Sequence, residues 1–147
     1  MMRAVLALML LATPAMAEAI PQAVPMEPFN GAFVIPVVLN GVLTEKFIVD
    51  SGSADVSIPA EVALRLKTMG ALSGADFLGS RTYMLADGSK VSSDIYRIGS
   101  ITIGRTVIHD VTVRISAEKS HLLLGQSFLS RLKSWSVDNT RKLMAFN

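Results

Sequence analysis

The sequence contains no cysteine. The chain therefore has no disulfide, no thiolate metal site, no cysteine nucleophile and no cysteine for lipid attachment. Histidine is also scarce, with two in 147 residues. A metal centre built from several histidines of one chain is not expected, and we predict neither a metal nor a cofactor. The net charge is only +2 and no long run of like charges occurs, which argues against a nucleic-acid-binding protein.

The composition is that of a folded domain. Half of the residues are hydrophobic, and a small net charge with this hydrophobic share is not typical of disorder. A chain of 147 residues has the length of one domain of ordinary size.

The first residues have the pattern of an export signal. Arg3 precedes an apolar run over residues 4–12, and Ala15-Met16-Ala17 fits an A-x-A cleavage site. We expect a Sec-type signal peptide over residues 1–17, cleaved after Ala17, and a periplasmic or secreted protein without a membrane span. The run is shorter than the roughly 18 residues of a spanning helix, so an uncleaved anchor is the less favoured alternative.

Prolines mark the segment that follows. Pro21, Pro25 and Pro28 predict an extended leader or linker over residues 18–30, because proline disfavours a helix interior. The domain itself is expected over residues 31–147.

The domain has mainly β patterns. Two runs rich in β-branched residues, 32–39 and 42–49, flank Asn40-Gly41, a strong hairpin signal. Pro36 within the first run indicates an edge position or a bulge.

Further elements follow from turn signals and periodicity. Pro59 to Met69 predicts a helix with Val62, Leu66 and Met69 on one face, ended by Gly70. We expect a loop over 71–79 and a second short helix over 126–132. The other predicted strands are 81–85 and 91–95 around a glycine turn, then 96–103, 106–115, 135–137 and 143–146. Many short strands predict an all-β sandwich or barrel with one or two short helices.

One apolar strand runs directly into Asp50-Ser51-Gly52. A carboxylate at the end of a buried strand needs hydrogen-bond donors, because its desolvation is costly. Ser51 offers a hydroxyl, and Gly52 lets backbone amides come close. Taken alone, the tripeptide is better explained as a turn that caps a strand, which is a common structure.

A second motif changes that balance. Phe47-Ile48-Val49-Asp50-Ser51-Gly52 resembles the active-site signature of aspartic proteases, and Leu123-Leu124-Gly125 matches their second signature. Gly31 to Phe33, Asn40-Gly41 and Gln126-Ser127-Phe128-Leu129 extend the similarity to exported bacterial retropepsin-like proteins, over about residues 31–146. Ser51 stands where threonine is commoner and Ser53 where alanine is usual.

The resemblance implies a closed retropepsin-like β-barrel, half of an acid protease, that forms a C2 homodimer. It implies that Asp50 is catalytic and that a hairpin near residue 87 is a flap that closes over a peptide or protein substrate. The residues carried over as loop support are Ser51, Gly52, Leu123, Leu124 and Gly125, and those of the flap are Leu85, Ala86, Asp87 and Gly88.

The reaction requires two carboxylates, one charged to activate water and one protonated to donate to the scissile carbonyl. The chain has only one Asp-Ser-Gly. A homodimer supplies the second acid by symmetry. Asp55 lies outside the signature and is expected to matter far less than Asp50.

Two rival interpretations remain. One is a retropepsin-like module that binds peptides or dimerises without cleaving them, and the other is a structural protein with a fortuitous Asp-Ser-Gly. The second rival does not account for Leu123-Leu124-Gly125. A catalytic triad that uses His109-Asp110 is less favoured than a surface pair at a strand end.

Overall fold

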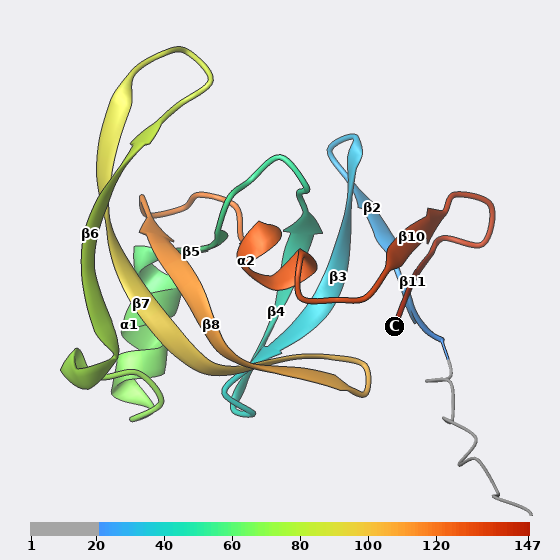
Figure 1. Cartoon of the computed structure of the whole chain (residues 1–147), viewed down its shortest axis with the longest axis horizontal. Helices are drawn as coiled ribbons and strands as arrows, with labels where there is room; N and C mark the ends of the chain where they lie inside the picture. The colour runs from blue at the N-terminus through green and yellow to red at the C-terminus, as the bar shows by residue number, and fades with distance from the viewer. Residues whose placement is uncertain (1–20) are drawn as a thin grey trace, which may run out of the picture.

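The computed structural model describes residues 21–147, which form a mainly β structure with two short α-helices (Figure 1). The predicted signal peptide and residues 18–20 lie outside the described residues. The elements in chain order are β1 (Gln22–Pro25), β2 (Glu27–Phe29), β3 (Ala32–Leu39), β4 (Leu43–Val49), β5 (Val56–Pro59), α1 (Ala60–Thr68), the 3-10 helix η1 (Gly74–Asp76), β6 (Phe77–Met84), β7 (Lys90–Ile103), β8 (Thr106–Ser116), β9 (Leu123–Leu124), α2 (Gln126–Leu129), β10 (Trp135–Asp138) and β11 (Leu143–Phe146).

The larger sheet closes on itself. Its strand order is β2-β3-β4-β9-β5-β8-β7-β6, and β3 also pairs with β7. That extra pairing joins two strands from different parts of the order and makes a barrel. The mainly β class predicted from the sequence is confirmed. The homodimer is a separate matter that a single chain does not address.

The β3–β4 hairpin has the predicted form. Asn40 and Gly41 both have positive φ, 48° and 68°, and the N–H of Val42 donates to the Leu39 carbonyl at 3.1 Å, as in a tight β-turn. Pro36 is exposed and falls between the residues of β3 that pair with β2 and those that pair with β7. The strand is therefore not a sheet edge. Pro36 instead lies in the gap between the pairing of β3 with β2 and its pairing with β7, where the N–H that proline lacks is not needed for the sheet.

The proline-rich segment is extended, as expected, and its described part is built into both sheets. β2 pairs with β3, and β1 pairs with β11 in a second sheet of order β1-β11-β10. This smaller sheet lies at the end of the molecule opposite the β6–β7 hairpin (Figure 1). The leader or linker was expected over residues 18–30, but residues 22–25 and 27–29 of it are strands of the folded structure.

The region between residues 71 and 103 differs from the sequence prediction. The loop expected over 71–79 contains η1 and the start of β6, where a bulge at Gly79 (φ 110°) lets the strand begin earlier. The strands expected at 91–95 and 96–103 are one strand, β7, because β8 pairs with β7 from Ile95 to Ile103 in a single register.

Helix α1 follows its prediction except at its end. Val62 and Leu66 are buried, and Gly70 adopts the left-handed conformation that stops the helix. Met69 was expected on the same face, but it is 51% exposed because it already lies at the C-cap. Among the described residues, no helix has the length and apolar character needed to cross a membrane.

The core ties the sequence motifs to the barrel. Leu124 of the second motif is fully buried, and so is Phe128 three residues after that motif. Phe47, at the start of the first motif, is buried beside them in the same cluster. Phe47 and Leu124 therefore anchor the two motifs in the core, which leaves the polar residues of the motifs at its surface.

Candidate active site

The two sequence motifs lie side by side. β4 pairs in parallel with the short strand β9, with Ile48 opposite Leu123 and Val49 opposite Leu124. The backbone N–H of Asp50 donates to the carbonyl of Leu124 at 3.2 Å. The end of β4 is thus held against the second motif, which fixes where the Asp50 loop begins.

Within the loop, backbone groups support the Asp50 carboxylate. The N–H of Gly52 donates to Asp50 Oδ1 at 3.0 Å, and the N–H of Ser53 donates to the Asp50 carbonyl at 3.2 Å. A Cβ at position 52 would lie 3.3 Å from Asp50 Oδ1, so glycine permits the close approach. Asp50 is half-buried, while Ser51 and Gly52 are exposed.

Gly125 lies against the backbone of the same loop. A Cβ there would lie 2.3 Å from the carbonyl oxygen of Asp55 and 2.8 Å from that of Ser53. The next two N–H groups, of Gln126 and Ser127, donate to the carbonyls of Ser53 and Ala54 at 2.8 and 2.9 Å. The start of α2 therefore closes directly on the loop, and only glycine leaves room for it.

Two polar residues that the sequence analysis did not single out add to this support. The Gln126 side chain donates from Nε2 to the Ser51 carbonyl at 2.8 Å. Ser127 Oγ accepts from the N–H of Val56 at 2.8 Å and donates to the Thr112 carbonyl at 2.7 Å. Their position directly after Leu-Leu-Gly was the only signal available in the sequence.

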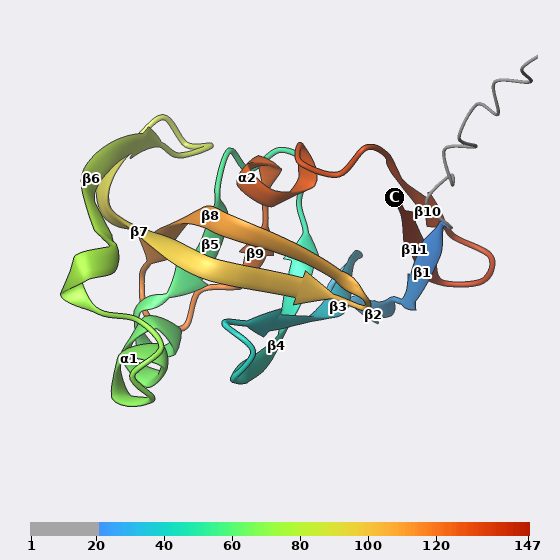
Figure 2. The ribbon, with the colours of Figure 1, turned by 60° about the horizontal axis from the view of Figure 1, so that its bottom comes forward.

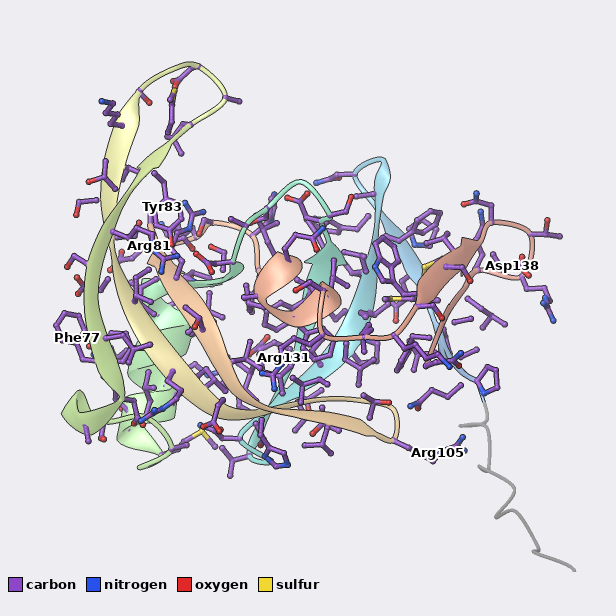
Figure 3. All side chains as sticks on the ribbon, in the orientation of Figure 1. Phe77, Arg81, Tyr83, Arg105, Arg131 and Asp138 are labelled. Atoms are coloured by element: carbon purple, nitrogen blue, oxygen red, sulfur yellow. The ribbon has the colours of Figure 1, made fainter. Side chains whose placement is uncertain are left out.

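Asp55 has a larger role than its place outside the signature suggested. It is 7% exposed, and its Oδ2 accepts from Arg81 Nη1 at 2.9 Å and from Tyr83 Oη at 2.5 Å. Both donors extend from β6 (Figure 3). Burial, and then the hydrogen bond to Asp55, raise the pKa of Tyr83. Asp55 thus fastens the outer half of β6 to the Asp50 loop.

The tip of the β6–β7 hairpin bends toward the Asp50 loop (Figure 2). Between them lies a cleft of about 440 Å³, lined by Asp50, Gly52, Ser53, Ala54, Tyr83, Met84, Leu85, Ala86, Arg114 and Leu123. Of the four predicted flap residues, Leu85 and Ala86 line this cleft. Asp87 and Gly88 form the turn at the hairpin tip instead.

The tip is an ordered turn. Gly88 has a φ of 82° and donates to the Leu85 carbonyl at 2.9 Å. The hydroxyl and the N–H of Ser89 both donate to Asp87 Oδ1, at 2.6 and 2.9 Å, and these hydrogen bonds lower the pKa of Asp87. Met84, just before the turn, is 73% exposed, so an apolar side chain reaches the mouth of the cleft.

The cleft contains two charged residues, Asp50 and Arg114. The cleft of a single chain therefore offers one carboxylate to a bound molecule. Over residues 35–131, which include the Asp50 loop, the hairpin and the second motif, the chain matches the family described as gag-polyprotein putative aspartyl protease. The chain belongs to this family.

Two solved structures have a similar fold. A retropepsin-like aspartic protease from Rickettsia conorii is 22% identical, with a TM-score of 0.63 over 86% of this chain and 89% of that one. The retroviral protease-like domain of Ddi1 from Leishmania major is 18% identical, with a TM-score of 0.52 over 79% of this chain and 88% of that one. No curated protein sequence matches the chain.

Membership in the aspartyl protease family confirms the resemblance stated from the two motifs. The structural similarity, at these identities, confirms the retropepsin-like barrel.

Proposed function

We propose that this chain is an aspartic endopeptidase that hydrolyses peptide bonds with a water molecule activated by two Asp50 residues across a homodimer. The observation that carries the proposal is the position of Asp50. It lies in a loop that β9 and α2 hold by backbone hydrogen bonds, and it lines the cleft under the β6–β7 hairpin. Such support preorganises a carboxylate in one place before substrate binds.

The assembly follows from the chemistry. One carboxylate in the cleft cannot serve as both the base that takes a proton from water and the acid that donates to the scissile carbonyl. A two-fold axis beside Asp50 brings its copy to the same site, and two close carboxylates share one proton. The exposure of Ser51 and Gly52 in the single chain leaves the face of this loop open to a second copy.

The substrate is an extended peptide. The cleft lies between a β-hairpin and a loop, with Met84 and Leu85 exposed at its mouth, and a peptide in strand conformation fits such a groove. Asp55 holds β6 through Arg81 and Tyr83, which leaves the tip of the hairpin, residues 85–89, to move over a bound peptide.

The test of the proposal is hydrolysis of an unfolded protein by the purified chain, scanned from acidic to neutral pH. New internal N-termini in the products are expected and would identify an endopeptidase. Binding of peptides without any cleavage across that range would instead favour a retropepsin-like binding module.

We also propose that the protein is exported. Arg3, the apolar run over residues 4–12 and Ala15-Met16-Ala17 support a signal peptide cleaved after Ala17. N-terminal sequencing of the protein recovered from the periplasm or the medium is expected to begin at or near Glu18. Recovery of the protein in the membrane fraction with Met1 at its N-terminus would contradict the proposal.

A further inference from the structure

Arg114 is the one cationic residue that lines the cleft. It lies on β8, in register with Ser57 of β5 on one side and Ile95 of β7 on the other. Because β8 is an interior strand of the barrel, the backbone that carries Arg114 is held from both sides. The guanidinium is therefore presented to the cleft from a rigid part of the fold.

The side chain is also held in place. Its guanidinium carbon lies 4.8 Å from the centroid of the Tyr83 ring, and Nη2 lies 3.3 Å from the Oγ of buried Ser57. Stacking on an aromatic face and one long hydrogen bond orient a guanidinium without neutralising its charge. Most of its five N–H donors remain for another acceptor.

No carboxylate within residues 21–147 forms an ion pair with Arg114. The nearby buried acid, Asp55, pairs with Arg81 instead. Arg114 is half-buried, so it has lost part of its hydration without gaining an anionic partner. A carboxylate that enters the cleft would give Arg114 an anionic partner, and a guanidinium can bind a carboxylate through two parallel hydrogen bonds.

We propose that Arg114 is a specificity-determining residue that binds a carboxylate of the substrate, so that the protein prefers extended peptides with an acidic side chain close to the scissile bond. The inference rests on the proposed function, because it names the substrate class of the same cleft. In a homodimer, symmetry places one Arg114 on each side of the Asp50 pair, and the preference is then expected on both sides of the scissile bond.

The test uses peptides that differ at one position at a time. Each peptide has an acetylated N-terminus and an amidated C-terminus. Glu, Gln or Lys is placed in turn at each position near a cleavage site that the hydrolysis of an unfolded protein has identified. We expect kcat/KM for Glu peptides to exceed that for Gln peptides by about tenfold at the positions that Arg114 reaches, because a charge-assisted hydrogen bond is about twice as strong as a neutral one. Lys should be disfavoured further, and added salt should weaken the preference.

Variants test whether the preference for Glu peptides depends on Arg114. Arg114→Gln should bring the ratio of Glu to Gln peptides close to one, and Arg114→Glu should reverse the preference towards Lys. Arg105→Gln is the matched control, because Arg105 is exposed at the β7–β8 turn, far from Tyr83 (Figure 3). It should keep the wild-type ratio. If the Arg114 variants do not fold, the wild-type preference and its salt dependence still decide the matter.

Binding measurements separate this inference from the proposed function. Affinities of the Asp50→Asn protein for the same peptides, labelled with a fluorophore, are expected to favour Glu. If the wild type cleaves nothing but Glu peptides still bind most tightly, the protease proposal fails and the role of Arg114 stands. Equal affinities and equal cleavage rates for Glu, Gln and Lys peptides would overturn the inference. The Gln peptides are also prepared with a free C-terminus. A preference for these over the amidated Gln peptides, without a preference for Glu, would show that Arg114 binds the terminal carboxylate and would also overturn the inference.

Discussion

Asp50→Asn should reduce peptide hydrolysis by roughly a hundredfold to ten-thousandfold, the range typical of general acid–base catalysis. The substitution removes the ionisable group from both chains of the proposed dimer while keeping the size of the side chain. The asparagine Oδ1 can still accept the hydrogen bond that Gly52 donates to Asp50 at 3.0 Å, so the loop should keep its shape. The measurement is the initial rate of peptide cleavage, together with the thermal unfolding midpoint.

The matched control is Asp110→Asn. The Asp110 side chain is 73% exposed on β8 and makes only a long ion pair with Arg97 at 3.9 Å. Its φ of 53° is a conformation that asparagine also tolerates. We expect wild-type activity and stability from this variant. Equal activity in Asp50→Asn and Asp110→Asn would remove Asp50 from the mechanism.

Gly125→Ala should have the largest effect on stability. The new Cβ would lie 2.3 Å from the carbonyl oxygen of Asp55 and 2.6 Å from its carbonyl carbon, and both are backbone atoms. A backbone contact cannot be relieved by rotating a side chain, so either α2 or the Asp50 loop must move. We expect a loss of about 3 kcal/mol or more, at the upper end of overpacking substitutions, in the free energy of unfolding measured with urea.

Gly74→Ala provides the comparison. Gly74 has negative φ, and a Cβ there would have no heavy atom within 4 Å. Such a change is expected to be neutral or to stabilise by about 0.4–1 kcal/mol, because it restricts the unfolded chain. The steric account of Gly125 would be wrong if the two alanine variants unfolded at the same urea concentration.

The local signals in the sequence predicted much of the fold. Hairpin turns with Asn-Gly or a glycine, and the β-branched runs beside them, act over a few residues and can be recognised without the rest of the chain. This explains why β3, which ends at Asn40-Gly41, has the predicted bounds. The same approach divided β7 between Ile95 and Tyr96, although no turn residue stands there. Pairing with β8 runs across that point, with Ile95 opposite Arg114 and Tyr96 opposite Val113, and it keeps the strand extended.

The parts of the site that were missed depend on contacts between distant residues. Arg81 and Tyr83 meet Asp55 across 26 and 28 positions of sequence, and Arg114 meets Ser57 across 57. No periodicity or motif links such residues, since the barrel closure brings them together. Asp50 could be predicted because the residues that identify it are its neighbours in the sequence and the single second motif, Leu123-Leu124-Gly125.

The most direct test of the central claim is to mix wild-type and Asp50→Asn chains in equal amounts, refold them together so that subunits exchange, and measure total activity. If catalysis needs one Asp50 from each chain, only dimers of two wild-type chains are active, and activity should fall to about a quarter of that of the same total amount of wild-type protein. Activity at one half of the wild-type value would show that each chain works alone, and it would contradict the shared Asp50 pair.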